Sequence, residues 1–315
     1  MRYILFTGGA GFIGSSFCEL LLEDPENYIV IVDNLATGCI DKLPQRHKER
    51  YKFIKCDINN YTDVSAIFMS YHFDYVFHYA AVVGVKRTQE NPVMVLKDLH
   101  GIEHILNLSK NSAVKRVFFS SSSEVYGEPV EFPQNEETTP LNSRIPYAIV
   151  KNVGEAFLKS YHKEFGLDYT IFRFFNTYGP KQSPDFVMSR FIRLALSNQP
   201  ITIYGDGKQT RTFCFIDDNI SATNSVFQQA CQNSDYPNEV INIGNDNEIQ
   251  IIDLAKEILN LTGSKSQIQH LPPLEEGDMT RRLPDISKMK TLLGREHISL
   301  KEGISKVIEN TSFIL

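Results

Sequence analysis

The sequence predicts an α/β protein built on a doubly wound parallel sheet, and three observations support this fold class. Apolar runs at 3–6, 28–32, 75–79 and 117–120 are short and continuous, as in strands that are buried on both faces. Helical spacing of apolar residues lies between these runs, so that strand and helix alternate along the first half of the chain. The first run also leads directly through glycines into a helical pattern.

The glycine turn after the first predicted strand has the form of a pyrophosphate site. Glycines recur at every third position from Gly8 to Gly14, and helical spacing follows over 12–22. Such a turn brings bare backbone N–H groups and the positive end of a helix dipole to one point. The residues expected to contact the dinucleotide here are Gly8, Gly11, Phe12, Ile13 and Gly14.

The end of the second predicted strand indicates which dinucleotide is bound. Asp33 closes the apolar run 28–32, roughly 20 residues beyond the turn, where a carboxylate can accept hydrogen bonds from the adenosine ribose. Asn34 and Leu35 follow, so no cation stands ready for a 2′-phosphate. We therefore expect NAD as the cofactor, with Asp33 and Asn34 beside it.

The next two strand ends extend the predicted cofactor site. Asp57 and Ile58 follow the predicted strand 51–55, and Asp57 either meets the adenine edge or caps the helix that begins near Tyr61. Ala80 and Ala81 follow the strand 75–79, and their small side chains would let the backbone pass close to the cofactor. Because ligands collect at the carboxyl ends of parallel strands, these residues fit one site.

A hydroxyl-rich strand end is followed later in the chain by a tyrosine and a lysine at helical spacing. Ser122, Ser123 and Glu124 follow the strand that begins at Val117, and Tyr147 and Lys151 share one face of a predicted helix over 147–165. A nearby ammonium would favour the phenolate form of tyrosine. Tyr147 could then take a proton from a sugar hydroxyl that Ser122 holds.

Composition limits the other functions open to the chain. Its 315 residues are 42% hydrophobic and carry a net charge of −6, which gives no basic surface for nucleic acid. The sequence contains neither an apolar run of the roughly 20 residues that span a bilayer nor an evident signal peptide. Five cysteines show no metal-ligand spacing, which favours reduced thiols in the cytoplasm, and no metal site is expected.

Several signatures occur in one order along nearly the whole chain. They are Thr7–Gly14, Asp33, Ser122–Gly127, Tyr147-x-x-x-Lys151, Asn176 and Thr210-Arg211-x-Phe213. In this combination the chain resembles the extended short-chain dehydrogenases that modify nucleotide sugars. The resemblance implies tightly held NAD, with Lys151 contacting the nicotinamide ribose. It also implies a UDP-sugar or related substrate, and a homodimer joined by helices near 93–111 and 147–165.

The resemblance also divides the chain into two lobes. We expect a Rossmann-like NAD-binding domain over 1–176, which also receives parts of 208–255. A smaller, partly interleaved nucleotide-sugar lobe is expected over 177–315, mainly 177–207 and 262–315. The residues that the resemblance places against the substrate are Lys86, Asn176, Arg190, Tyr204, Gln209, Arg211 and Arg282.

The reaction that follows oxidation at C4 of the sugar stays open between three outcomes. Ser123 replaces the general acid of the common dTDP-glucose 4,6-dehydratases, and Ser-Glu resembles UDP-glucuronate decarboxylases and also GDP-mannose 4,6-dehydratases. The latter normally use NADP, which Asp33 argues against. The stretch Arg282–Ile286 also resembles the decarboxylases, whereas 82–86 and 148–150 depart from them. Decarboxylation is the preferred hypothesis, with a 4,6-dehydratase or a 4-epimerase as alternatives, and a non-catalytic nucleotide-binding regulator as the alternative from another class.

Overall fold

The computed structural model of the protein describes residues 1–272 and 281–314, apart from the side chains of Val85 and Lys86. Within this part the chain forms two compact units. The first comprises 1–127, 141–174 and 223–241, and the second comprises 128–140, 175–222 and the described residues after 241. The segment 128–140 thus belongs to the second unit, although the predicted boundary places it in the first. The reason is backbone pairing with the C-terminal part of the chain. The Gln134 N–H donates to the Leu283 carbonyl, and the Asp285 N–H donates to the Gln134 carbonyl.

The first unit contains a seven-stranded sheet with the order β11-β6-β5-β4-β1-β2-β3. Within the six strands from β6 to β3 in this order, all neighbouring strands are parallel. Its strands are β1 (Arg2–Thr7), β2 (Asn27–Asp33), β3 (Tyr51–Lys55), β4 (Tyr75–His78), β5 (Arg116–Ser122), β6 (Asp168–Phe174) and β11 (Glu239–Ile243). From β1, the strands β2 and β3 extend the sheet in one direction, whereas β4, β5 and β6 extend it in the other. The doubly wound sheet predicted from the sequence is therefore confirmed.

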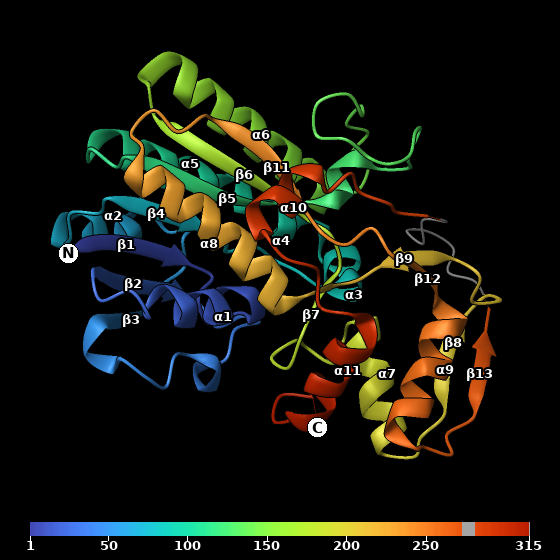
Figure 1. The fold of residues 1–315 in the computed structure, drawn as a ribbon. Helices are drawn as coiled ribbons and strands as arrows, with labels where there is room; N and C mark the ends of the chain where they lie inside the picture. The colour runs from blue at the N-terminus through green and yellow to red at the C-terminus, as the bar shows by residue number, and fades with distance from the viewer. Residues whose placement is uncertain (273–280, 315) are drawn as a thin grey trace. The chain divides into compact units, whose positions relative to one another are not determined.

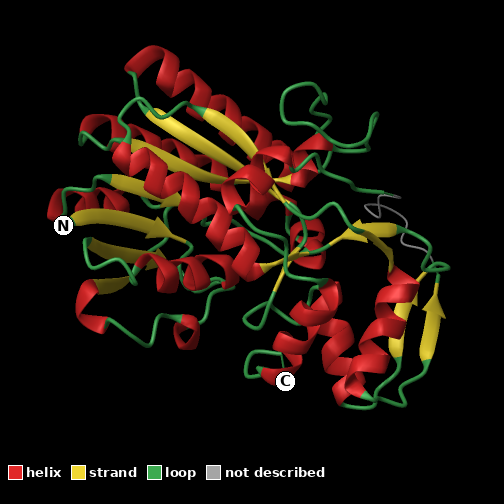
Figure 2. Cartoon of the chain, in the orientation of Figure 1, coloured by secondary structure: helices red, strands yellow, loops and turns green. Residues whose placement is uncertain are grey.

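Helices cover both faces of this sheet (Figure 2). The helices of this unit are α1 (Phe12–Leu21), α2 (Tyr61–Ser70), α3 (Val85–Glu90), α4 (Pro92–Leu96), α5 (Asp98–Asn111), α6 (Pro146–Phe165) and the C-terminal part of α8 (Ile216–Gln232), with 3-10 turns η1 (Ile40–Lys42), η2 (Lys48–Arg50) and η3 (Ser123–Tyr126). Figure 1 shows α1 and α8 on one face and α2, α5 and α6 on the other.

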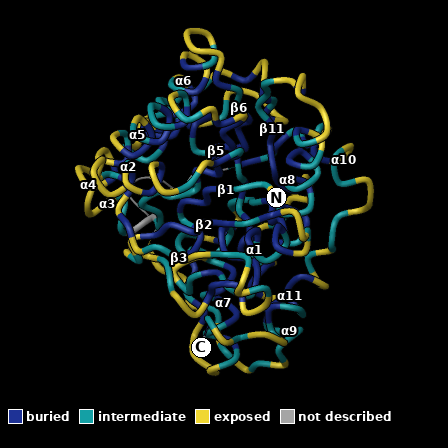
Figure 3. The backbone as a smooth tube through the Cα atoms, turned by 90° about the vertical axis from the view of Figure 1, so that its left-hand side faces the viewer, coloured by how far each residue is buried: buried dark blue, intermediate teal, exposed yellow. Residues whose placement is uncertain are grey.

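Alternating side chains of the central strands fill the two faces. Phe77 and Phe118 stack with ring centres 4.5 Å apart and contact Phe227 of α8, while Phe77 also meets Phe17 of α1. Their neighbours in sequence point the other way, into a core formed with α2, α5 and α6. All seven residues of β5 are buried (Figure 3), as expected for a strand covered on both faces.

The second unit consists of small sheets and helices. Its elements are β7 (Thr177–Tyr178), β8 (Ile201–Tyr204), β9 (Thr210–Thr212), β10 (Cys214–Phe215), β12 (Glu248–Gln250), β13 (Ile268–Leu271), α7 (Val187–Leu196), α9 (Ile251–Thr262), α10 (Ser287–Leu293) and α11 (Leu300–Glu309). β8 pairs in parallel with β13, and β9 pairs antiparallel with β12. Buried apolar residues of α7, α9 and α11, such as Phe191, Leu254 and Ile304, form its core.

One predicted helix is interrupted. The pattern over 93–111 folds as two helices, α4 and α5, which meet at Lys97. The Asp98 carboxylate at the start of α5 accepts a hydrogen bond from the backbone N–H of Val82 at 2.7 Å. Asp98 therefore ties the start of α5 to the loop after β4.

Candidate active site

The glycine turn folds as the sequence predicts. Gly8 has a φ of +74°, which favours glycine, and its N–H donates to the Val32 carbonyl at 2.7 Å. A Cβ at Gly8 would lie 2.6 Å from the backbone nitrogen of Ala80, and a Cβ at Gly14 would clash with the Gly8 carbonyl. The turn is thus packed too closely, against both α1 and the loop after β4, to hold a larger side chain.

The start of α1 leaves donors for an anion. Gly11 is its N-cap and supplies no side-chain cap, and Phe12 and Ile13 form its first turn. The first N–H groups of a helix have no partner within the helix, and the helix dipole adds positive potential there. These residues can hold a dinucleotide pyrophosphate.

Asp33 lies at the end of β2 with its carboxylate fixed by backbone donors. Ala10 N–H and Leu35 N–H donate to it at 3.1 and 2.8 Å, and the residue is only 8% exposed. Burial raises the pKa of Asp33, while these two hydrogen bonds act against that shift. Its neighbour Asn34 is exposed and accepts a hydrogen bond from Ala36 N–H.

The strand ends around Asp33 differ in detail from the predictions. Asp57 is exposed and accepts the Asn59 N–H, but the N-cap of α2 is Asn60, which accepts the Thr62 N–H, so the capping alternative for Asp57 is wrong. Ile58 is buried.

Ala80 and Ala81 are partly buried in the loop after β4. The Thr7 hydroxyl holds this loop, because it accepts the Ala80 N–H at 3.3 Å and lies 2.9 Å from Nδ1 of the buried His78. Neither Thr7 nor His78 was among the predicted site residues.

The predicted catalytic residues lie on β5, η3 and α6, which pack together in the first unit. Ser122 ends β5, and its hydroxyl accepts the Glu124 N–H at 3.2 Å, so that it caps η3. Ser123 is buried, and Glu124 is partly buried. Tyr147 lies in the first turn of α6, which Pro146 begins.

Lys151 is deeply buried, with 2% of its surface exposed. Its Nζ donates to the Ser120 hydroxyl at 3.4 Å and lies 5.9 Å from the ring centre of Tyr147. Burial lowers the pKa of Lys151 to about 8, while the negative charge of Asp98 acts in the opposite direction. Lys151 thus keeps its positive charge at neutral pH, on the same helix face as the phenol of Tyr147.

Asp98 is a further polar residue that the sequence reasoning missed. It is 6% exposed, and besides Val82 N–H it contacts the Asn59 amide at 3.5 Å. Burial raises the pKa of Asp98, although the Val82 N–H and the charge of Lys151 oppose this. No spacing in the sequence connects Asp98 to Lys151, so this charge pairing became visible only in the fold.

The predicted substrate residues, except Lys86, lie in the second unit. The Lys86 side chain is outside the described residues, although its backbone belongs to α3. Arg190 lies 5.9 Å from the Tyr204 ring centre, and the Gln209 amide donates to the Tyr204 carbonyl at 3.3 Å. These three residues therefore gather around the end of β8.

The Arg190 guanidinium offers a donor for a ligand. Its Nε is buried and makes no hydrogen bond within the described part of the chain. Buried donors usually have a partner, so this nitrogen fits an anion or carbonyl of a bound substrate. Burial lowers the pKa of Arg190, while the Tyr204 phenol opposes this.

The remaining substrate residues lie on other segments of this unit. Asn176 donates to the Thr212 carbonyl at 3.1 Å, Arg211 donates to the Thr210 carbonyl at 2.8 Å, and Arg282 is 6% exposed. Arg281, its neighbour, instead makes a two-point ion pair with Glu248 and stacks on Phe132.

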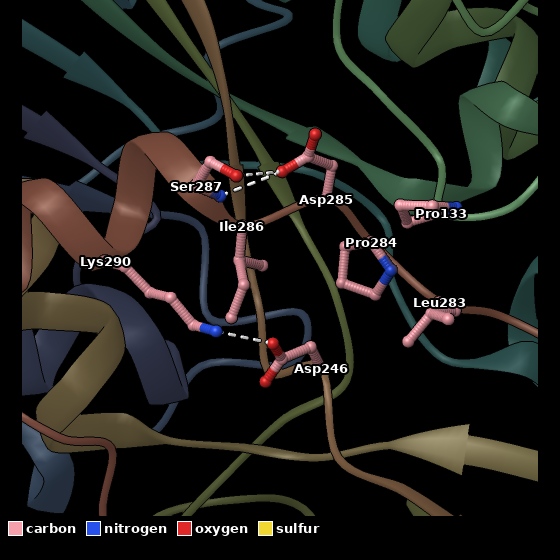
Figure 4. Close-up of a pocket in the computed structure, with 8 residues that line it drawn as sticks. All are labelled: Pro133, Asp246, Leu283, Pro284, Asp285, Ile286, Ser287 and Lys290. Atoms are coloured by element: carbon pink, nitrogen blue, oxygen red, sulfur yellow. Dashed lines mark hydrogen bonds and ion pairs between the residues drawn. The ribbon is translucent and has the colours of Figure 1, made fainter.

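A cavity of about 420 Å³ in the second unit contains none of the predicted site residues (Figure 4). It is lined by Pro133, Asp246, Leu283, Pro284, Asp285, Ile286, Ser287 and Lys290. Its polar groups largely satisfy one another, because Lys290 pairs with Asp246 at 2.6 Å and Ser287 donates to Asp285. Four of its lining residues, Leu283 to Ile286, directly follow Arg282 in the sequence.

Over 1–272 and 281–314, no cluster of three His, Cys, Asp or Glu side chains could hold a metal ion. Nor does this part of the chain contain a helix with the length and apolar character needed to cross a membrane.

Together, the doubly wound sheet, the glycine turn and the Ser-Tyr-Lys set define a short-chain dehydrogenase of the extended type. More specifically, a family model described as GDP-mannose 4,6 dehydratase matches residues 5–307, so the chain belongs to this family of nucleotide-sugar enzymes. The family resemblance predicted from the motifs is therefore confirmed.

Individual relatives are named for several of the predicted reactions. A putative UDP-glucose 4-epimerase from Methanocaldococcus jannaschii is 35% identical over 97% of each chain. UDP-glucuronic acid decarboxylase 1 from Danio rerio is 35% identical over 98% of this chain and 72% of its own length. The structure of UDP-glucuronic acid 4-epimerase from Bacillus cereus, solved with UDP-glucuronic acid and NAD, matches with a TM-score of 0.87 and 32% identity over 99% of both chains.

Proposed function

We propose that this protein is an NAD-dependent enzyme that transiently oxidises C4 of UDP-glucuronate and then removes the C6 carboxylate as CO₂. The observation that carries the redox part is the buried Lys151, four residues after Tyr147 and hydrogen-bonded to the strand that ends at Ser122. The decarboxylase from Danio rerio and the epimerase structure from Bacillus cereus support UDP-glucuronate as the substrate.

The residues of the first unit fit NAD. Gly8, Gly11 and Gly14 leave room for a pyrophosphate at the start of α1, and Asp33 stands at the end of β2, where ribose hydroxyls can donate to it. When bound, the dinucleotide would supply the hydride acceptor for oxidation at C4.

Tyr147 would take the proton from the C4 hydroxyl. A phenol is a poor base at its ordinary pKa near 10, but a neighbouring positive charge favours the phenolate. The Lys151 ammonium supplies that charge from the same face of α6, and Ser122 would hold the sugar hydroxyl by a hydrogen bond.

Once C4 is a ketone, the C6 carboxylate becomes that of a β-keto acid, and such acids lose CO₂ readily. When the C5–C6 bond breaks, CO₂ leaves and its bonding electrons pass to C5, which then needs a proton. Glu124, in η3 directly after Ser122 and Ser123, would move this proton or order the water that delivers it. In the second unit, Arg282 would hold the anionic part of the substrate.

The second candidate is 4-epimerisation of UDP-glucuronate. The epimerase from Bacillus cereus, 32% identical over 99% of both chains, favours it. The roles of Tyr147, Lys151 and Ser122 are the same in both reactions. The two reactions differ in whether the C6 carboxylate is lost.

Mass spectrometry of the product, after incubation with UDP-glucuronate, UDP-glucose or UDP-N-acetylglucosamine, tests the proposal. Loss of CO₂ from UDP-glucuronate is expected. An unchanged mass with changed retention would mean an epimerase, and loss of water from a neutral sugar would mean a dehydratase. Tyr147→Phe is the matched control: it should retain nucleotide-sugar binding but lose turnover, whereas a non-catalytic regulator would have no turnover to lose.

We further propose that the protein acts in the cytoplasm as a homodimer. All five cysteines are free thiols, which suits a reducing compartment. The dimer would form through the apolar surface of α4 and α6, which we define by Val93, Met94, Leu96 and Ile149, all between 37% and 68% exposed.

A further inference from the structure

A buried charged cluster joins four elements of the first unit, three of which also carry the proposed catalytic residues. Its members are Ser121 of β5, Tyr126 of η3, Glu155 of α6 and Arg173 of β6, and none is more than 2% exposed. Arg173 makes a two-point ion pair with Glu155, through Nε at 2.9 Å and Nη2 at 2.7 Å. Its remaining Nη1 donates to the Tyr126 hydroxyl at 2.8 Å, and the Ser121 hydroxyl donates to Glu155 at 2.6 Å.

General stability is a weak explanation for such a pair. Removing two charges from water is costly, and buried ion pairs are often no more stabilising than apolar residues of the same volume. What the planar guanidinium and the carboxylate do supply is fixed geometry, because both groups are held by two-point contact. The cluster therefore specifies how its four elements lie relative to one another.

Each of three joined elements carries a residue of the proposed reaction. Ser121 directly precedes Ser122, and Tyr126 ends the turn that contains Glu124. Glu155 follows Lys151 by four residues on the same face of α6, which also carries Tyr147. One ion pair thus links the strand end, the turn and the helix that hold the whole catalytic set.

We propose that Glu155 and Arg173 are positioning residues that set the placement of Ser122 and Glu124 relative to Tyr147 and Lys151. This inference rests on the proposed function for its kinetic consequence. Its structural consequence, an ordered turn η3, does not depend on which reaction the enzyme performs.

The same strand offers a matched control. Arg116 begins β5, at the end opposite Ser122, and is 3% exposed. It donates to the carbonyls of Tyr169 and Tyr236 and lies 3.8 Å from Asp168. Arg116→Lys disturbs a buried cation network of similar size, whose hydrogen bonds lie at the end of β5 opposite Ser122.

The first test compares Glu155→Gln with Arg116→Lys in the NAD-loaded enzyme. Misplacement of catalytic groups lowers kcat, so we expect Glu155→Gln to lose roughly 10- to 100-fold in kcat per NAD-loaded site, with KM nearly unchanged. Arg116→Lys should lower the melting temperature and leave kcat near wild type. If Glu155→Gln lowers only the melting temperature, the positioning role is wrong.

The second test measures hydrogen exchange of the η3 amides, which needs no turnover. The Glu124 and Gly127 N–H groups are hydrogen-bonded within this turn, to the Ser122 hydroxyl and the Glu124 carbonyl. They should exchange faster in Glu155→Gln and at the wild-type rate in Arg116→Lys. Unchanged exchange in both variants would overturn the inference.

These two readouts separate this inference from the proposed function. If the wild-type enzyme converts no UDP-sugar, the proposed function fails and the exchange rates alone decide the positioning role. If Glu155→Gln does not fold, Ser121→Ala and Tyr126→Phe replace it, since each removes one hydrogen bond and leaves the ion pair. Wild-type kcat and exchange in both of these variants would contradict the proposal.

Discussion

At the scale of single residues, the proposed mechanism makes the fate of the oxidised sugar depend on Glu124. This carboxylate follows the hydroxyls of Ser122 and Ser123, and its own N–H is fixed by Ser122. In the proposed mechanism, oxidation at C4 uses Tyr147 and Lys151 but no carboxylate, whereas proton movement at C5 needs an acid or base. The two steps can therefore be separated by one substitution.

We expect Glu124→Gln to retain NAD binding and oxidation at C4 but to lose product formation by roughly 100-fold or more, as for removal of a general acid or base. NADH absorbance at the active site, measured beside product mass, would reveal this as accumulated reduced cofactor. Normal product formation would remove Glu124 from the mechanism and favour the 4-epimerase.

His78 gives the fold a dependence on acid. Burial, assisted by the charge of Lys151, lowers the pKa of His78 to about 3, compared with 6.5 for an unperturbed histidine. Between these two values the unfolded chain binds a proton that the folded chain does not. The free energy of unfolding therefore falls as the pH drops through this window, by about 1.4 kcal/mol per unit once well below the upper value.

The comparison that isolates this effect is wild type against His78→Asn. Urea unfolding at about pH 6.5 and about pH 5 should show wild type losing roughly 1–2 kcal/mol more than the variant, because other titrating groups are shared. Equal losses would mean that His78 does not titrate differently in the two states.

At the scale of secondary-structure elements, the close approach of the turn after β1 to the loop after β4 depends on Gly8. Gly166, which ends α6, makes an ideal comparison, because its φ of +73° nearly equals the +74° of Gly8 while its Cβ position is open space. Gly166→Ala should cost about 1 kcal/mol through backbone conformation alone and leave NAD affinity unchanged.

Gly8→Ala adds a clash with the backbone of Ala80 to the same conformational cost. We expect a larger loss of stability than for Gly166→Ala, and at least a roughly tenfold weaker affinity for NAD, measured by calorimetry. If the two variants bind NAD equally well, the close packing of this turn does not shape the cofactor site.

The elements also show where sequence reasoning succeeded and where it stopped. Strands β1, β2, β4 and β5 were predictable because each contains a short continuous apolar run. The break at Lys97 was not, because apolar spacing continues across it through Leu96 and Leu99. The pairing of β9 with β12 was also invisible, since strands of three residues carry no period.

Some residues of the candidate site could likewise be predicted from the sequence, and others could not. The spacings of Gly8, Asp33, Ser122, Tyr147 and Lys151 in the sequence are enough to predict roles for them before any fold is known. Asp98 and Arg173 act through partners 53 and 18 residues away, Lys151 and Glu155, and only packing brings them together. A charged residue inside the apolar run 169–174 was the one available signal for Arg173.

At the scale of the whole molecule, the apolar surface of α4 and α6 tests the proposed dimer. Wild type should sediment as a homodimer, and Val93→Asp combined with Ile149→Asp should sediment as a monomer, because charges would be buried at the interface. Met69→Asp is the control, since Met69 is 87% exposed on α2, outside this surface. A variant that stays dimeric would place the interface elsewhere.

The division of the chain into interrupted segments has a consequence for synthesis on the ribosome. Arg116 emerges early, but Tyr236, Pro237 and Asn238, which accept its hydrogen bonds, emerge more than a hundred residues later. The edge strand β11 is equally late, and the segment 175–222 of the second unit is made before either. The growing chain therefore cannot finish its first unit and then begin the second, as independent domains do. The first unit stays incomplete until residue 241 has been released, and the second until the residues after 241 have followed.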